Sequence, residues 1–205
     1  MTRQVKRIVL ATRNQGKVRE LQAMLSGLGV EVLGLDRFPD IGEIPETGDT
    51  FEENARIKAR AVSAATGLVS LADDSGLAVD ALGGEPGVRS ARYSGEGATD
   101  ASNNAKLLAA LAQVADASRG CRFVSAVVAS APDGRELLFR GEWPGLVTRT
   151  AKGEGGFGYD PLFLDQELGL TAAEMTAGQK NARSHRGRAM RAMLEHLPGF
   201  LVSPS

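Results

Sequence analysis

The chain has 205 residues and a formal net charge of −1 at pH 7, with 24 Lys and Arg against 25 Asp and Glu. This near balance argues against a nucleic-acid polymer or an anionic membrane as the partner, because both bind strongly basic surfaces. No apolar run approaches the roughly 18 residues of a membrane span, and Cys121 is the only cysteine, so we expect a single domain over residues 1–205 that is soluble, cytoplasmic and free of disulfides.

The amino-terminal half predicts strands that alternate with helices. Apolar runs bounded by polar or glycine-containing turns indicate strands over 7–12, 30–35 and 68–72, the last with a short continuation over 77–82. One helix is indicated by apolar residues at helical spacing before Gly29, namely Val18, Leu21, Leu25 and Leu28. A second helix is expected to begin at a capping box of Thr50 and Glu53 and to end near Ala65.

The carboxyl-terminal half adds a hairpin and two further helices. Apolar runs over 123–131 and 136–143 are joined through Pro132-Asp133-Gly134, which is a strong hairpin signal and makes the predicted sheet mixed. A helix is expected from Thr99 or Asp100, with one face formed by Ala105, Leu108, Leu111 and Ala112. The final helix is expected over 184–197, with an inward face formed by Ala189, Met190, Met193 and Leu197.

A polar loop follows the first strand and precedes the first helix. Free backbone N–H groups and the helix dipole favour an anion at such a place, and Lys17 adds a positive charge. The loop is formed by Thr12, Arg13, Asn14, Gln15, Gly16 and Lys17. It lacks the glycine and the Ser or Thr of a Walker A loop, and an ordinary turn with Asn14 as helix cap is the alternative interpretation.

Two adjacent carboxylates, Asp73 and Asp74, follow the third expected strand and precede Ser75-Gly76. Neighbouring side chains of a strand point to opposite faces, so one of the two should face a partner if the strand is buried. A metal site is one interpretation. The other is a strand end at which both Asp residues begin a turn.

A glycine-rich loop over 153–158 matches the spacing G-x-G-x-x-G. The dinucleotide-binding interpretation fails because that motif must open a helix, whereas residues 159–163 indicate an extended segment. The loop presents Phe157 and Tyr159, which either pack in the core or form an apolar wall for a flat ring.

Two further polar groups stand out. Asn54 and Lys58 share one face of the second helix, with Glu46 in the loop before it, and this row either lines a cleft or is a solvated face. Lys180, His185 and Arg186 lie around the start of the last helix, where the dipole disfavours cations, so an anionic or acceptor-rich partner is indicated.

With these pieces in order, the chain closely resembles the inosine/xanthosine triphosphate pyrophosphatase family over nearly its whole length. Members of that family hydrolyse non-standard purine nucleoside triphosphates to the monophosphate and pyrophosphate. The resemblance is carried by six motifs, ATRNQGKVREL, ETGDTFEENARIKA, LADDSGLAVDALGGEPGVRSARYSG, the WPG at Trp143, GEGGFGYDPLF and KNARSHRG.

The resemblance implies roles for matching residues. The loop from Thr12 to Lys17 is similar to the triphosphate-binding loop, Asp74 to the general base and a metal ligand, and Glu46 to a second ligand of Mg²⁺. Ser75 resembles a substrate contact, and the catalytic shell is completed by Asn54, Lys58 and Asp73. The residues that resemble the family's wall for base and sugar are Phe157, Gly158, Tyr159 and Asp160. Those that resemble its purine-reading group are Lys180, His185 and Arg186.

The implied fold is mixed α/β, with an elongated central sheet, flanking helices and two lobes around an active-site cleft. The implied enzyme is a Mg²⁺-dependent homodimer that acts on ITP, dITP and XTP. Two alternatives stay open at this point, a related pyrophosphatase with another base preference and a nucleotide sensor that does not hydrolyse its ligand.

Overall fold

The computed structural model describes residues 6–202 and divides the chain into two compact units. Unit 1 comprises residues up to Asp74, Ala126–Phe139 and residues from Ala189, and unit 2 comprises Ser75–Ser125 and Arg140–Arg188. Each unit has a hydrophobic core of its own. The expectation of one domain over 1–205 stays a prediction.

The strands form a seven-stranded sheet with the order β2-β1-β3-β4-β5-β6-β7. They are β1 (Lys6–Leu10), β2 (Val30–Gly34), β3 (Val69–Val79), β4 (Gly120–Ser130), β5 (Glu136–Val147), β6 (Phe163–Asp165) and β7 (Leu170–Thr171). The pairs that β1 makes with β2 and β3 are parallel, and the pairs that β6 makes with β5 and β7 are antiparallel. The predicted mixed α/β fold is therefore confirmed.

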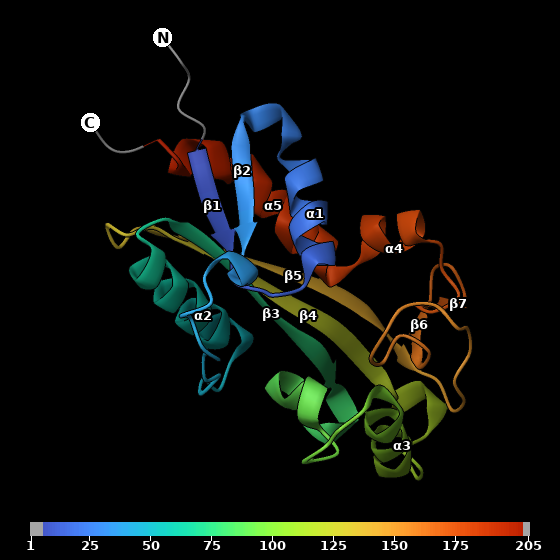
Figure 1. Cartoon of the computed structure of the whole chain (residues 1–205). Helices are drawn as coiled ribbons and strands as arrows, with labels where there is room; N and C mark the ends of the chain where they lie inside the picture. Colours follow the sequence, from blue (N-terminus) through green and yellow to red (C-terminus); the bar gives the residue numbers. More distant parts are fainter. Residues whose placement is uncertain (1–5, 203–205) are drawn as a thin grey trace. The chain divides into compact units, whose positions relative to one another are not determined.

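The helices are α1 (Gln15–Met24), α2 (Phe51–Thr66), α3 (Asp100–Ala110), α4 (Ala177–Arg183) and α5 (His185–Phe200), drawn in Figure 1. The predicted capping box at Thr50 and Glu53 starts α2. Within the described part of the chain, none of these helices combines the length and the apolar character that crossing a bilayer requires.

The core of unit 1 forms where α1 and α5 cover the start of the sheet. Successive side chains of a strand alternate in direction, so Ile8 and Leu10 join this core while Val9 joins a second cluster with Leu35 and Val62. From the helices, the predicted residues Val18, Leu21, Leu25, Ala189, Met193 and Leu197 are buried. Leu28 was expected on the same face as Val18, but it is 45% exposed because α1 ends at Met24 and a 3-10 turn follows.

Strand β3 differs most from the prediction. It runs without a break from Val69 to Val79, through Asp73, Asp74 and Ser75, so the two Asp residues do not end a strand or begin a turn. In the sheet order β3 lies between β1 and β4, and it continues beyond the segment Val69 to Leu71 that pairs with β1. Its place in the sheet overrides the weak strand propensity of Asp, Ser and Gly.

The core of unit 2 is rich in aromatic rings. Phe123, Trp143 and Phe163 contact one another with ring centroids 4.6 to 6.3 Å apart. The buried face of α3 is Asn103, Leu107 and Leu111. Of the expected face, Leu111 is buried and Leu108 packs against this core. Ala105 and Ala112 were predicted wrongly, because they are exposed.

One local prediction in unit 2 was also wrong. Residues 159–162 form a turn, closed by the hydrogen bond of the Leu162 N–H to the Tyr159 oxygen at 2.9 Å, and only Phe163 begins a strand. The final helix expected over 184–197 is confirmed as α5. Another helix, α4, precedes it, contains Lys180 in its last turn and ends at Arg183. Ser184 has an extended backbone and separates α4 from α5.

Candidate functional site

The polar loop after β1 is capped from within. The side-chain oxygen of Asn14 accepts hydrogen bonds from the N–H groups of Gly16 and Lys17, at 2.9 and 3.3 Å. The interpretation of Asn14 as a helix cap is therefore confirmed. Because only the first few N–H groups of a helix are available to an anion, binding here would depend mainly on side chains such as Lys17.

Two other side chains of this loop hold it to the rest of unit 1. Arg13 donates to the backbone oxygen of Ile41 at 2.5 Å, and Gln15 donates to a carboxylate oxygen of Asp36 at 2.6 Å. Both contacts fix the loop against the segment that follows β2. Their predicted contact with substrate stays a prediction.

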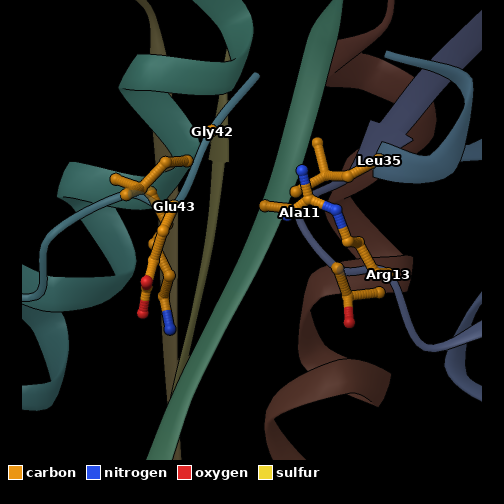
Figure 2. Close-up of a pocket in the computed structure, with 8 residues that line it drawn as sticks. Ala11, Arg13, Leu35, Gly42 and Glu43 are labelled. Atoms are coloured by element: carbon orange, nitrogen blue, oxygen red, sulfur yellow. The ribbon is translucent and has the colours of Figure 1, made fainter. Parts of the chain in front are cut away.

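A pocket in unit 1 brings Thr12, Arg13 and Lys58 together. The remaining lining residues are Ala11, Leu35, Gly42, Glu43 and Ile44. Figure 2 shows Gly42 and Glu43 on one wall and Ala11, Leu35 and Arg13 on the other. A hydroxyl and two cationic side chains are groups that bind phosphate oxygens through charge-assisted hydrogen bonds.

The carboxylates of β3 pair with lysines of two different helices. Lys17 of α1 lies 3.3 Å from Asp73, and Lys58 of α2 lies 3.8 Å from Asp74. Lys58 also donates to Glu46 at 2.7 Å. Unit 1 therefore gathers three carboxylates and two ammonium groups that the sequence placed far apart.

Glu46 and Asp74 fit the predicted cation site. One ammonium group, that of Lys58, contacts a carboxylate oxygen of each, so the two side chains face a common point that favours positive charge. Over residues 6–202, no cluster of three or more His, Cys, Asp and Glu side chains is suited to hold a metal by itself. Two protein carboxylates match Mg²⁺, which completes its octahedron with water and phosphate oxygens.

Asn54 lies in the interior of unit 1. Its side chain is fully buried, and its oxygen accepts a hydrogen bond from the Gly48 N–H at 2.8 Å. A Cβ on Gly48 would lie 2.6 Å from the Cβ of Glu53, so only glycine allows the loop this close to α2. The solvated-face interpretation is wrong for Asn54, which instead holds the loop that carries Glu46.

In unit 2 an exposed ring is surrounded by cationic groups. The Phe157 side chain is 63% exposed. The Lys180 ammonium lies 4.9 Å from the ring centroid and the Arg186 guanidinium 6.0 Å from it. Arg186 also donates to the Ser75 hydroxyl at 3.3 Å. A flat apolar surface next to hydrogen-bond donors can bind the face and the acceptor edge of a planar heterocycle.

Tyr159 and Asp160 lie in the interior, in contrast to Phe157. The Tyr159 hydroxyl donates to the backbone oxygen of Ser90 at 2.9 Å, and burial raises the pKa of Tyr159 above its ordinary value. Asp160 accepts hydrogen bonds from the Phe157 N–H at 2.8 Å and from Lys180. Tyr159 thus packs in the core, which was one of its two interpretations.

His185 stacks on Phe123, with ring centroids 4.9 Å apart and an angle of 16° between the planes. Its ring is therefore held against the aromatic core of unit 2 at the first residue of α5. The structure thus brings Phe157, Lys180 and Arg186 together. His185, which precedes Arg186 in the chain, packs on Phe123 instead.

A comparison with the sequences of known families decides which family the chain belongs to. The family described as the Ham1 family matches residues 8–196, which is nearly the whole chain. The chain belongs to the Ham1 family.

Two relatives and one solved structure are similar to this chain over nearly their full length. A protein of Nitratidesulfovibrio vulgaris named dITP/XTP pyrophosphatase is 55% identical over 94% of this chain and 96% of its own. A protein of Nocardia farcinica with the same name is 55% identical over 93% of this chain and 94% of its own. The solved structure of the Staphylococcus aureus Ham1 protein has 39% identity and a TM-score of 0.89, and it covers 95% of this chain and 100% of that one. The resemblance drawn from the motifs is confirmed.

The sequence analysis missed a buried polar group that supports α4 in this Ham1 protein. Asp165 is 1% exposed and accepts hydrogen bonds from the Trp143 indole at 2.8 Å and from Arg183 at 2.6 Å. Arg183 is the last residue of α4, the helix of Lys180. The Trp of the WPG motif was the one signal present in the sequence, but nothing local connects it with Asp165 or Arg183.

Proposed function

We propose that this chain is a nucleoside triphosphate pyrophosphatase that hydrolyses ITP, dITP and XTP to the monophosphate and pyrophosphate. The names of the full-length relatives at 55% identity support the substrate class. The observation that carries the proposal is the group of Glu46, Lys58 and Asp74 in unit 1. It combines two carboxylates of the kind that bind a cation with a lysine that lies 2.7 Å from Glu46 and 3.8 Å from Asp74.

In the proposed reaction, Asp74 orients a water molecule and accepts its proton as the water attacks the α-phosphorus. Glu46 and Asp74 would hold Mg²⁺, which when bound neutralises phosphate charge and favours departure of pyrophosphate. Lys17 and Lys58 donate to phosphate oxygens on which negative charge accumulates as the bond to the leaving pyrophosphate breaks. Asp73 holds Lys17 in place through their ion pair.

In unit 2, we propose that Phe157 packs against the face of the purine while Lys180, His185 and Arg186 read its edge. Hypoxanthine and xanthine carry an oxygen acceptor at position 6, where adenine carries a donor amine. A donor that meets this oxygen gains a hydrogen bond, and the same donor is left unsatisfied against adenine. Ser75 holds the Arg186 guanidinium through the hydrogen bond at 3.3 Å.

The test is hydrolysis of ITP, XTP, dITP, GTP and ATP, with separate detection of pyrophosphate and phosphate, in Mg²⁺ and in EDTA. The proposal predicts pyrophosphate from ITP, dITP and XTP in Mg²⁺ and little turnover of ATP. Another preferred triphosphate would identify a relative with a different base preference, and tight binding without turnover would identify a sensor. Formation of IDP and phosphate would rule out attack at the α-phosphorus.

Asp74→Asn is the matched variant for this panel, since it keeps the size of the side chain and removes the base. We expect turnover of ITP to fall by at least about 1,000-fold, within the range for loss of a general base and charge at the reacting centre, with an unchanged thermal midpoint. Near-normal turnover would remove Asp74 from the role of base. Arg186→Ala should reduce the preference for ITP over ATP.

The proposal includes a cytoplasmic homodimer, as the family resemblance implies. Light scattering coupled to size-exclusion chromatography measures the mass directly. A mass near twice the 21.5 kDa of one chain agrees with it, and a mass of one chain at micromolar concentration contradicts it.

A further inference from the structure

The exposed ring of Phe157 lies on a segment that has no helix or strand of its own. The chain from 151 to 158 contains four glycines, at positions 153, 155, 156 and 158. Glycine has the largest conformational freedom of all residues. A wall for a base on such a segment binds weakly unless the protein holds it in the bound conformation, because ordering it opposes binding. Something outside the loop must therefore fix it.

Two side chains of α3 hold the residue directly after Phe157. The Asp100 carboxylate accepts a hydrogen bond from the Gly158 N–H at 2.6 Å, and the Asn104 amide donates to the Gly158 oxygen at 3.0 Å. Positions 100 and 104 are four apart, so they project from the same face of the helix. Together they satisfy both polar groups of one residue, whose φ of +62° is available to glycine at low cost.

The helix that makes these contacts is itself fixed within unit 2. Its start is set by a capping box in which the Thr99 hydroxyl accepts from the Ser102 N–H at 3.1 Å. One turn on, the buried Asn103 accepts from the Ser94 N–H at 2.7 Å and donates to the backbone oxygen of Ala91 at 3.1 Å. In Figure 1, α3 lies at the end of unit 2 that also contains the chain leading into β6.

On the other side of Phe157, its own N–H donates to Asp160, which is 3% exposed. The backbone is thus held immediately before the ring by the interior and immediately after it by α3. The ring is left exposed while its backbone has few alternative conformations. This is the arrangement expected for a preorganised binding wall.

We propose that Asp100 and Asn104 are positioning residues that hold Phe157 in the conformation that binds the purine. We call the two hydrogen bonds from Asp100 and Asn104 to Gly158 the clamp. The effect of the clamp on catalysis rests on the proposed function, but the clamp itself exists without substrate. Neither residue needs to touch the nucleotide. Loss of either should weaken binding of the triphosphate and leave the chemical step nearly unchanged.

Amide hydrogen exchange of the ligand-free protein tests the clamp directly. In Asp100→Ala, exchange in the segment that contains Gly158 should be at least tenfold faster, while Asp100→Asn, which keeps an acceptor oxygen, should restore most of the protection. Asp116→Ala is the matched control, because it removes an exposed carboxylate that contacts Arg149 at 2.6 Å elsewhere in unit 2. Unchanged exchange in Asp100→Ala, with the rest of α3 protected as before, overturns the proposal.

Steady-state kinetics with ITP tests the consequence. We expect the KM of Asp100→Ala and of Asn104→Ala to rise about tenfold with kcat within about twofold, and no change in Asp116→Ala. A double-mutant cycle identifies the route of the effect. If Asp100 acts through Phe157, Asp100→Ala adds nothing in a Phe157→Ala background, whereas multiplied effects on KM would overturn the proposal. A wild-type chain without ITP turnover would refute the proposed function instead, and the exchange result would stand separately.

Discussion

The replacement Asp165→Asn tests how unit 2 holds the end of α4. One carboxylate oxygen of the buried Asp165 accepts from the Trp143 indole and from Arg183, at 2.8 and 2.6 Å. The other accepts from the N–H groups of Glu167 and Leu168, at 2.9 and 3.1 Å. In the asparagine variant, the side-chain oxygen can still accept from the N–H groups of Glu167 and Leu168. The NH₂ group then faces the Trp143 indole and Arg183, which are both donors.

The magnitude follows from the groups left unsatisfied. The Trp143 side chain is 1% exposed, so its orphaned indole N–H costs about 1–3 kcal/mol, and loss of the charged acceptor costs about 1.5–3 kcal/mol more. We expect the free energy of unfolding at pH 7 to fall by about 3 kcal/mol. For a chain of this size the thermal midpoint then falls by about 6–12 °C.

The effect should depend on pH in a defined direction. Burial alone would raise the pKa of Asp165, but hydrogen bonds from Arg183 and Trp143 outweigh it and hold the pKa below its ordinary value. A carboxyl with a lowered pKa stabilises the fold above its unfolded pKa of about 4, and this stability is lost as the pH falls through the folded value. The difference between wild type and variant should therefore narrow from pH 7 toward pH 3.

Urea unfolding followed by fluorescence measures this directly, because Trp143 is the only tryptophan. Asp116→Asn is the control, since its contact with Arg149 is exposed and such pairs contribute less than about 1 kcal/mol. A loss below about 1 kcal/mol in Asp165→Asn, or a difference that does not change with pH, would refute the reasoning on buried hydrogen bonds.

Three further outcomes are expected. Burial raises the pKa of the Cys121 thiol to about 12, so a thiol reagent at pH 8 should label the urea-unfolded chain and not the folded one; rapid labelling of the folded chain would contradict the buried environment. Gly156→Ala should reduce ITP turnover at least tenfold, because its φ is +77° and a Cβ would lie 2.1 Å from the Asp160 carboxylate, while Gly178→Ala, with open space around it, should have normal activity. Glu46→Gln should raise the Mg²⁺ concentration for half-maximal turnover about tenfold at an unchanged thermal midpoint, and an unchanged Mg²⁺ dependence would remove Glu46 from the cation site.

The features that sequence reasoning predicted well are those decided by neighbouring residues. The capping box at Thr50 and Glu53 is closed by reciprocal hydrogen bonds within four residues, and the hairpin turn at Pro132-Asp133-Gly134 is equally local. The candidate site residues were predicted from motifs rather than from contacts. That Lys58 contacts both Glu46 and Asp74 required the fold.

The path of β3 could not be predicted from its own residues. Asp, Ser and Gly are depleted in strands, so a strand end followed by a turn was one of the two interpretations of the stretch from Asp73 to Gly76. Strand β3 is hydrogen-bonded to its neighbours in the sheet, and this pairing, rather than the local propensity of its residues, decides the conformation. The same pairing explains why Asp73 and Asp74 meet different lysines, because consecutive side chains of a strand point to opposite faces.

The hydrogen bonds of Asp100 and Asn104 to Gly158 were not predicted, because the buried face predicted for α3 did not include Asn103. Apolar periodicity counts a buried asparagine as exposed, and Asn103 lies on the buried face of α3 with Leu107 and Leu111. The predicted face of Ala105, Leu108, Leu111 and Ala112 was correct for the two leucines but left out Asn103. Asp100 and Asn104, which lie beside Asn103, were therefore not predicted to have a role.

The solvated-face interpretation of Asn54 was wrong for the same physical reason. In α2 and in α3, an asparagine stands four residues after the capping threonine, Thr50 or Thr99, and is buried. Each accepts a hydrogen bond from a backbone N–H of the segment before its own helix, at 2.8 Å for Asn54 and 2.7 Å for Asn103. A buried amide satisfied in this way ties a loop to the helix that follows it. The spacing T-x-x-x-N at a helix start therefore indicates, in this fold, an inward asparagine and a fixed loop, and in α2 that loop carries Glu46.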